Sequence, residues 1–170
     1  IKDKLGNSYN GLRINYSEET SPQGTGGGLL LATKKVKSEN YLVMNGDNFV
    51  EFNLSKFLGN HFENLNEASI LVKKVDDSRR FGTIKFDENM KVIDFREKDP
   101  AAGEGYINCG VYILNASVIK YLTRKPPFSL ELDFFPNITK RKFYAFKTEG
   151  RHLDIGTPES YEFAQTFFRK

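Results

Sequence analysis

The chain has 170 residues, of which 39% are hydrophobic, so it is long enough for one globular domain with a substantial core. Its formal net charge is +3, but the basic residues are scattered in pairs, which argues against a nucleic-acid-binding surface. The single cysteine, Cys109, excludes an internal disulfide framework, and the lack of a Cys/His cluster gives no sign of a zinc site. This cysteine usage fits a reducing cytoplasm, and no apolar run approaches the roughly 18 residues that span a bilayer.

The first elements surround a glycine-rich stretch. Residues 12–17 alternate between apolar and polar side chains and predict a strand. Apolar positions between Leu29 and Val36 predict a helix, with Thr25 as its N-cap. The consecutive glycines at 26–28 cost roughly 1 kcal/mol each in a first helical turn. They indicate either a planar or anionic ligand against the backbone amides or a tight corner packed on a strand.

Residues 41–47, YLVMNGD, are the central feature of the sequence. An apolar run followed by Asn45-Gly46-Asp47 predicts a buried strand whose carboxyl end presents a carboxylate. Ligands bind at this end of the strands in open α/β sheets. On these residues alone, Asp47 is better explained as a turn residue, and the motifs elsewhere in the chain favour the functional interpretation. With the preceding strand and helix, this segment predicts a βαβ unit.

The middle of the chain continues the alternation. Residues 53–65 predict a helix capped by Asn53, and residues 68–75 predict a strand, so a mostly parallel sheet covered by helices is expected. Residues 83–86 and 92–95 have the pattern of a β-hairpin. Residues 106–114 predict a long apolar strand interrupted by Asn108 and Gly110. A glycine inside such a strand often marks the close approach of a ligand or another backbone.

The last third predicts helices at 116–122 and near 130–139, a strand at 143–146 and a closing helix. Thr157 is the expected N-cap of that helix and Pro158 its first residue. Its apolar face comprises Tyr161, Ala164, Phe167 and Phe168.

Six short motifs follow one another along the chain. They are Pro22-Gln23-Gly24-Thr25-Gly26-Gly27, Asn45-Gly46-Asp47, Arg80-Phe81-Gly82-Thr83, Phe95-Arg96-Glu97-Lys98, Asn108-Cys109-Gly110-Val111-Tyr112 and Asp154-Ile155-Gly156-Thr157-Pro158-Glu159. Together they resemble the sugar-1-phosphate nucleotidyltransferases, most closely the bacterial branch that activates mannose- or heptose-type 1-phosphates. The resemblance covers essentially the whole chain. It implies an α/β fold with a mostly parallel, Rossmann-like sheet flanked by helices, a small antiparallel sugar-binding subsheet, and a single domain over residues 1–170.

The resemblance implies transfer of a nucleotidyl group from a nucleoside triphosphate, with GTP favoured, to a hexose or heptose 1-phosphate. The products are pyrophosphate and a nucleotide-sugar for cell-surface polysaccharide synthesis. Two polyanions must meet, which needs a divalent metal and cationic side chains but little general base, because the nucleophile is already ionised. The resemblance implies Mg²⁺ held by Asp47 and Asp154, with Lys98 facing the phosphate. Such enzymes often form dimers, so a homo-oligomer stays open, and neither nucleic acid nor membrane is an implied partner.

The remaining site residues are also implied by the resemblance. Gly82 borders the sugar through its backbone, Glu97 accepts hydrogen bonds from sugar hydroxyls, and Asn108 binds the sugar ring. The nucleoside pocket is lined by Gly24, Thr25 and Gly27. Taken alone, Asp154 is an ordinary turn residue before a helix, Glu97 and Lys98 form a solvated strand end, and Asn108 is a paired polar group. Arg79 and Arg80 are expected on an exposed turn.

One part of the family pattern is absent before Ile1: a first strand, its glycine-rich GGxGTR loop and a later Lys-Pro pair. That part amounts to roughly 60 residues by the size of βαβ units, so the chain corresponds to the C-terminal three-quarters of the family domain. We expect an unpaired sheet edge where the first strand is absent, and little activity from these residues alone.

Three other functions are compatible with parts of the sequence. A non-catalytic subunit or fragment that binds a sugar nucleotide and regulates a partner fits the absent loop, whereas the presence of both Asp47 and Asp154 argues against it. A metal-dependent glycosyltransferase typically carries a second carboxylate two residues from the first, and Asp47-Asn48-Phe49 offers none. A nucleic-acid-binding module would need its basic residues on one face.

Overall fold

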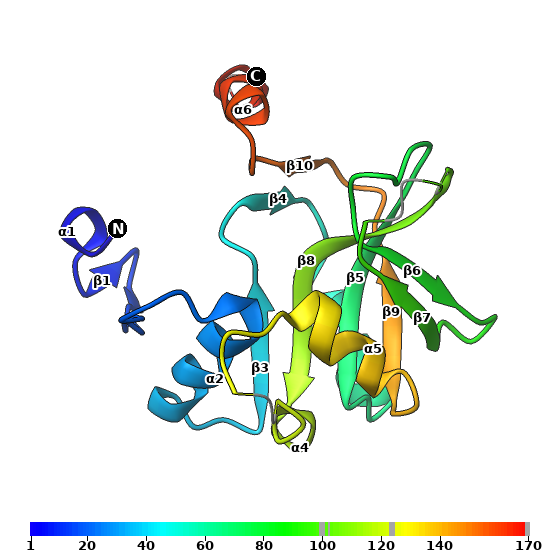
Figure 1. Cartoon of the computed structure of the whole chain (residues 1–170), viewed down its shortest axis with the longest axis horizontal. Coiled ribbons are helices and arrows are strands. Elements are labelled where there is room, and N and C mark those ends of the chain that lie inside the picture. Colours follow the sequence, from blue (N-terminus) through cyan, green and yellow to red (C-terminus); the bar gives the residue numbers. More distant parts are fainter. Residues whose placement is uncertain (99–100, 102, 123–124, 169–170) are drawn as a thin grey trace.

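The computed structural model describes residues 1–98, 101, 103–122 and 125–168, and a six-stranded sheet lies at its centre (Figure 1). The strand order is β7-β6-β8-β5-β9, with β3 paired to the free half of β8. The strands are β3 (Asn40–Met44), β5 (Ala68–Val75), β6 (Thr83–Phe86), β7 (Val92–Arg96), β8 (Gly105–Asn115) and β9 (Phe143–Lys147). The strands expected at 68–75, 106–114 and 143–146, and the hairpin at 83–95, are confirmed. The strand expected at 41–47 forms at Asn40–Met44, but the expectation that it is buried is wrong, because none of its residues is buried.

The strand directions in this sheet are mixed. β3, β5 and β6 each pair antiparallel with β8, and β9 pairs parallel with β5, so these four strands run one way and β7 and β8 the other. Because β8 lies in the middle, β5–β9 is the single parallel pair within the described chain. The α/β class is therefore confirmed. Most strands of the sheet run in the same direction, as expected, but most neighbouring strands pair antiparallel because β8 lies between them.

Alternate residues of β8 point to opposite faces of the sheet and build two cores. On one face Tyr112 packs against Phe135, with ring centroids 4.7 Å apart. On the other face Val111 and Ile113 pack around the fully buried Phe57. The first core is covered by α2 (Gly24–Lys35), α4 (Ala116–Ile119), the π-helical η1 (Leu130–Phe134) and α5 (Phe135–Ile138), and the second by α3 (Leu54–Glu63).

The N-terminal segment lies apart from the sheet (Figure 1). It contains α1 (Lys2–Leu5) and a hairpin of β1 (Ser8–Tyr9) and β2 (Leu12–Arg13), all exposed. The strand expected at 12–17 is thus limited to two residues and the βαβ unit does not form, since β2 buries no side chain that would favour pairing with β3. The other edge of β3 pairs with no strand in the described part of the chain, as expected. Leu42 and Met44 on β3 are 45% and 53% exposed.

The helix caps agree with expectation more closely than the helix faces. Asn53 caps α3 by accepting from Lys56 N at 2.9 Å, and Thr157 caps α6 (Pro158–Phe167) in a capping box with Ser160. The expected N-cap at Thr25 is wrong, because α2 begins after Gln23 and the Thr25 hydroxyl bonds elsewhere. Of the apolar face expected on α6, only Ala164 is buried, because α6 packs on little besides β10 and β4.

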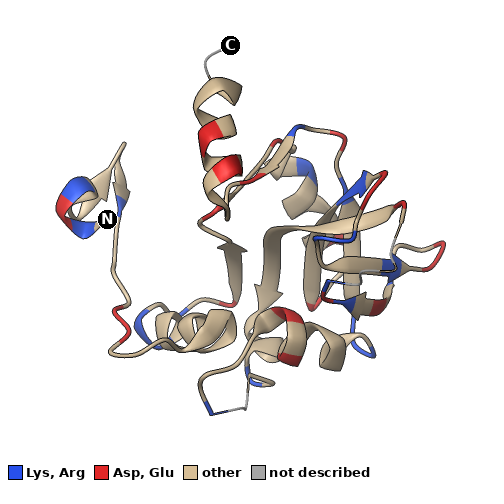
Figure 2. Ribbon diagram, turned by 45° about the horizontal axis from the view of Figure 1, so that its top comes forward, with Lys and Arg blue, Asp and Glu red and all other residues tan. Residues whose placement is uncertain are grey.

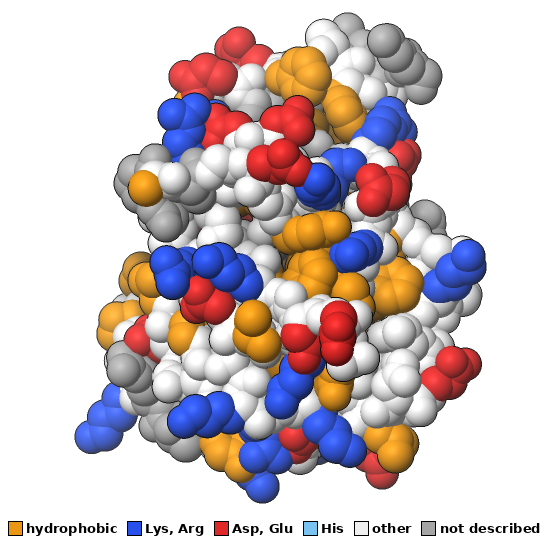
Figure 3. All heavy atoms as spheres, turned by 90° about the vertical axis from the view of Figure 1, so that its right-hand side faces the viewer, with side chains coloured by type: hydrophobic (Ala, Val, Ile, Leu, Met, Phe, Trp, Pro, Cys, Tyr) orange, Lys and Arg blue, Asp and Glu red, His pale blue; other side chains and the backbone are white. Residues whose placement is uncertain are grey.

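Charge is distributed in both signs over the molecule. Lys and Arg as well as Asp and Glu are spread over many parts of the ribbon in Figure 2, and on the face in Figure 3 basic and acidic side chains surround hydrophobic ones without forming a basic stripe. A nucleic-acid-binding surface gains no support there. Within the described residues, no helix has the length and apolar character to cross a membrane.

Candidate active site

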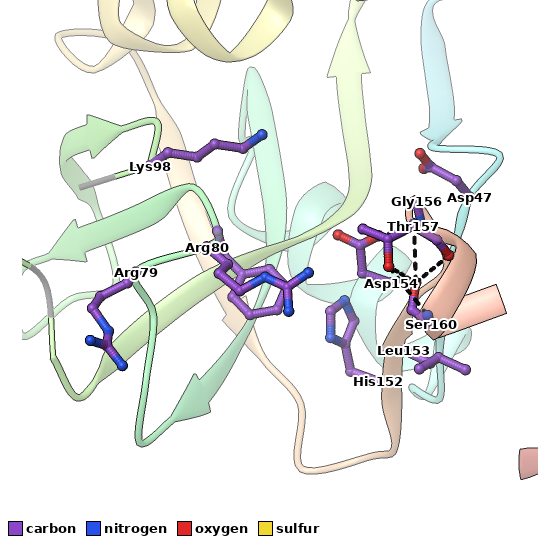
Figure 4. A pocket seen from close by; sticks show the side chains of 11 residues that line it. Asp47, Arg79, Arg80, Lys98, His152, Leu153, Asp154, Gly156, Thr157 and Ser160 are labelled. Carbon is purple, nitrogen blue, oxygen red and sulfur yellow. Dashed lines mark hydrogen bonds between the residues drawn. The ribbon is translucent and has the colours of Figure 1, made fainter. Parts of the chain in front are cut away.

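Two short strands, which were not predicted, bring Asp47 and Asp154 together. β4 (Asn48–Val50) and β10 (His152–Asp154) pair antiparallel, with Asp154 opposite Asn48. The backbone N of Ile155 donates to the Asp47 carbonyl at 2.8 Å. A Cβ placed on Gly156 would lie 3.0 Å from Asp154 Oδ1 and 3.7 Å from Asp47 Oδ2, so both carboxylates border this glycine. The loop ends at 45–47 and 154–156 therefore form one acidic site (Figure 4).

This pair of carboxylates has the donor chemistry that Mg²⁺ prefers. Mg²⁺ usually takes one or two carboxylates and completes its shell with phosphates and waters. Asp154 Oδ1 also accepts from Gly156 N at 2.8 Å, which orients the carboxylate. Among the residues described, no group of three or more His, Cys, Asp or Glu side chains forms an all-protein metal cage. The arrangement suits a metal shared with a phosphate ligand.

A small cavity of about 150 Å³ opens beside the aspartates. It brings together six of the expected site residues, and its lining is Asn45, Asp47, Asn48, Arg80, Phe81, Gly82, Glu97, Lys98, Asn108, Glu131 and Asp154. A Cβ on Gly82 would lie 2.7 Å from Glu97 Oε2, so a side chain there would displace the carboxylate. Asn108 N donates to the Gly82 carbonyl at 2.8 Å, which holds β8 against this segment.

Glu97 faces a second carboxylate across this cavity. Burial raises the pKa of Glu97, the charge of Glu131 raises it further, and Lys98 opposes both. Glu131 lies in η1, where it accepts from Thr25 Oγ1 at 2.8 Å and Ser129 Oγ at 2.7 Å. Sequence reasoning missed Glu131, because residues 130–139 gave only a helical pattern. The two carboxylates give the cavity several acceptors for hydroxyl groups.

The interruption of β8 has a structural cause. Gly110 has φ of +72°, and a Cβ there would lie 3.0 Å from Asn45 Cβ and 2.7 Å from Asn48 Nδ2. Asn45 N donates to the Gly110 carbonyl at 2.8 Å. The expected close approach of another backbone is confirmed, and it positions the turn that carries Asp47. Asn108 is paired as expected, donating to Tyr112 Oη at 2.7 Å and accepting from Gly110 N at 2.9 Å, which leaves one N–H and one lone pair for a ligand.

A second cavity of about 820 Å³ lies between α2 and the end of β3. Gly24, Thr25, Gly28, Met44 and Asp47 are among its lining residues. Gly27 is not, since a Cβ there would lie 2.7 Å from Gln23 Cβ and 3.2 Å from Pro126 Cβ, on the buried side of the helix.

The glycine row is therefore explained mainly by packing. Gly26 abuts the Phe128 ring and Gly27 abuts Pro126, while Gly28 is open to the cavity. Of the two explanations that the sequence left open, the tight corner applies, although it packs on the segment of Pro126 and Phe128 rather than on a strand.

A third cavity, of about 710 Å³, extends from the aspartates between β10, α6 and the β5–β6 connection. Arg79 and Arg80 are exposed as expected, but Arg80 points toward Asp154 and lines both this cavity and the small one (Figure 4). Arg79 also lines the third cavity, but its side chain points away from Asp154 and its Nε donates to Asp77 at 2.9 Å.

His152, which sequence reasoning missed, also lines the third cavity. Its Nε2 is buried and has no hydrogen-bond partner in the described part of the chain. Burial lowers the pKa of His152, Asp154 opposes this effect and Lys73 adds to it. Its position two residues before Asp154 was the available sequence signal, because alternate residues of a strand share a face.

Comparison with known proteins adds an independent finding. A model of the Nucleotidyl transferase family matches residues 1–170. The chain is 36% identical over 97% of its length to the D-glycero-alpha-D-manno-heptose 1-phosphate guanylyltransferase of Aneurinibacillus thermoaerophilus, 71% of which it covers. It is 34% identical to the mannose-1-phosphate guanylyltransferase catalytic subunit beta of Drosophila melanogaster, over 89% of the chain and 42% of that protein.

A solved structure agrees with these relatives. The crystal structure of HddC from Yersinia pseudotuberculosis, complexed with GMP-PN, superposes with a TM-score of 0.82 at 34% identity. The superposition covers 98% of this chain and 72% of that one.

Proposed function

The chain belongs to the nucleotidyl transferase family, and we propose that it transfers a guanylyl group from GTP to a heptose or mannose 1-phosphate, releasing pyrophosphate. Membership makes it a sugar-1-phosphate guanylyltransferase-like enzyme. The choice of GTP is supported by the names of the relatives and by the GMP-PN complex of HddC. The proposal includes a cytoplasmic location and one domain over residues 1–170.

The observation that carries the proposal is the meeting of three cavities at Asp47. Asp47 lines the cavity beside α2, the small cavity at Glu97 and the cavity beside β10. A nucleotide in the first and a sugar in the second would place their phosphates together at Asp47 and Asp154. This is the arrangement that joining two phosphate esters requires.

The chemistry needs charge neutralisation more than proton transfer. The sugar phosphate oxygen is already ionised at neutral pH and attacks the α-phosphorus in line with the departing pyrophosphate. Asp47 and Asp154 would hold a divalent cation, for which we propose Mg²⁺; when bound, it neutralises charge on the reacting phosphates. Lys98, which borders both the small and the third cavity, faces the transferring phosphate and adds a fixed positive charge.

The remaining residues bind and orient. Glu97 accepts hydrogen bonds from sugar hydroxyls, Asn108 orients the ring and Gly82 permits its close approach. Gly24 and Thr25 border the nucleoside. Gly27, which has no side chain, lets the first turn of α2 pack closely against Pro126 on the side away from the nucleoside.

A substrate panel tests the proposal. The protein as its own cells produce it should release pyrophosphate with GTP and either D-glycero-α-D-manno-heptose 1-phosphate or α-D-mannose 1-phosphate in the presence of Mg²⁺. UTP, CTP and dTTP should be poorer by at least about tenfold in kcat/KM, the value of one lost specific contact. Release with glucose 1-phosphate and dTTP in preference to these pairs would contradict the substrate assignment, and no release with any pair would contradict the function.

A further inference from the structure

The third cavity is not filled by the assignments made above. It shares Asp47, Arg80, Phe81, Lys98 and Asp154 with the small sugar cavity, so the two are continuous. The sugar cavity alone, at about 150 Å³, is smaller than the roughly 300–1,000 Å³ common for small-molecule sites. A substrate seated at Glu97 therefore has room to continue past the aspartates toward β10 and α6.

Two polar groups on opposite walls of this cavity lack partners. Arg80 makes no hydrogen bond or ion pair within the described chain, whereas its neighbour Arg79 is held by Asp77. Across the cavity, His152 Nε2 has no partner either. Thr157 and Ser160 also line the cavity but already bond to each other in the cap of α6. Asp47, Asp154 and Lys98 also line the cavity but are assigned above to the metal and the phosphate, so Arg80 and His152 are the lining groups left to recognise another part of a ligand.

Packing alone does not require a nitrogen at residue 152. The His152 ring meets the Phe81 ring edge-on, with centroids 5.9 Å apart, a contact that a phenyl ring makes equally well. An unpaired buried nitrogen costs free energy, and the last torsion of an imidazole is broad and roughly two-fold, so a turned ring that presents its other nitrogen-bearing edge is also a permitted rotamer. Because His152 and Asp154 are alternate residues of β10, the turned ring faces the same cavity as the carboxylate.

We propose that this cavity receives the hydroxylated chain that a heptose carries beyond its ring, with His152 and Arg80 binding its hydroxyls. This rests on the proposed function, and it makes the two residues selective for heptose over hexose 1-phosphate. A hydroxyl both donates and accepts, which suits an imidazole on one side and a donor-only guanidinium on the other. Mannose 1-phosphate lacks the terminal carbon and its hydroxyl, so it leaves at least one of these groups unpaired, a strong basis for discrimination.

Steady-state kinetics on the whole protein test this. In His152→Phe, which keeps the ring contact with Phe81, kcat/KM for D-glycero-α-D-manno-heptose 1-phosphate should fall about tenfold, the value of one uncharged hydrogen bond. The value for α-D-mannose 1-phosphate should change less than about threefold. His152→Gln should recover part of the preference. Arg80→Met should show a selective loss at least as large, because its hydrogen bonds are charged, while Arg79→Met should keep the wild-type ratio.

The results that would overturn the proposal can be told apart from one another. Equal losses for both sugars would assign His152 and Arg80 to the shared phosphate and overturn the proposal, as would an unchanged ratio. Protection of the wild type and variants from thermal unfolding by each sugar phosphate provides a second readout that needs no turnover. Pyrophosphate release absent in the wild type, with heptose 1-phosphate still protecting better than mannose 1-phosphate, would refute the transferase while supporting the heptose subsite.

Discussion

At the scale of single residues, the site contains a carboxylate, Glu97, whose ionised form is unfavourable to the stability of the folded protein. Glu97 is half-buried opposite Glu131, and both its burial and this neighbour favour the protonated acid. Hydrogen bonding to sugar hydroxyls favours the ionised form. A carboxylate kept in such surroundings indicates that function, rather than stability, determines the residue.

Replacing Glu97 should therefore separate stability from activity. Folding raises the pKa of Glu97 above its ordinary 4.5. The contribution of Glu97 to the free energy of unfolding is therefore most favourable below pH 4.5 and is lost as the pH rises through the folded-state pKa. At neutral pH, Glu97→Gln should raise the Tm, and this gain should vanish near pH 4. Its kcat/KM should fall roughly 10- to 100-fold, the value of a charged hydrogen bond. Glu88→Gln, at an exposed turn, is the control; a Glu97→Gln protein less stable than wild type at pH 7 would refute this prediction.

At the scale of elements, the helix caps and the long strands could be predicted from short stretches of sequence. Asn53, Thr157, β5 and β8 are where the sequence pattern placed them, because capping and apolar runs act over a few residues. β4 and β10 were not predicted, since three-residue strands carry no periodicity and form only when distant segments meet. Asp47 and Asp154, and the metal that they would share, were thus identified through the family motif. The strand pairing that joins them, and the places of Arg80, Glu131 and His152, required the three-dimensional structure.

Gly110 tests how β8 supports the turn that carries Asp47. Gly110→Ala would force an L residue into φ of +72° and press its Cβ onto Asn45 and Asn48. We expect a loss of about 2 kcal/mol or more in the free energy of unfolding by urea, with a further loss of turnover as Asp47 shifts. Gly103→Ala, where a Cβ meets open space, should change neither. Turnover and stability equal to those of wild type would show that the turn does not depend on Gly110.

At the scale of the whole molecule, a buried polar cluster joins α3 to the sheet. His61 is 1% exposed, its Nδ1 lies 2.9 Å from Ser69 Oγ and its Nε2 lies 3.3 Å from Asn40 Oδ1. Five apolar residues are spaced at helical intervals along residues 53–65. Phe57 is fully buried and Leu58 packs against it, whereas Leu54, Phe62 and Leu65 are 42%, 49% and 73% exposed. His61 takes the inner position because β3 and β5 offer it partners, which helical periodicity cannot reveal.

This cluster predicts a pH dependence of stability. Burial lowers the pKa of His61 below its ordinary 6.5, so the unfolded chain takes up protons first as the pH falls. The contribution of neutral His61 to the free energy of unfolding is fully present above pH 6.5 and is lost as the pH falls through the lower folded-state pKa. Between about pH 7.5 and about pH 5, wild type should lose on the order of 1 kcal/mol more unfolding free energy than His61→Gln, which cannot titrate. His152 titrates in both proteins, so its effect cancels in the comparison. Parallel plots of the free energy of unfolding by urea against pH for the two proteins would contradict the prediction.

The most direct test of the account is the rate of pyrophosphate release from GTP and D-glycero-α-D-manno-heptose 1-phosphate in Asp154→Asn, measured in the protein as its cells make it. We predict a fall on the order of 10³ in kcat, because several kcal/mol of charge stabilisation depend on this carboxylate, with the Tm nearly unchanged. Asp76→Asn, at an exposed position, should retain wild-type activity. Turnover retained in Asp154→Asn would contradict a catalytic role for the paired aspartates and would favour a non-catalytic, sugar-nucleotide-binding role for this chain.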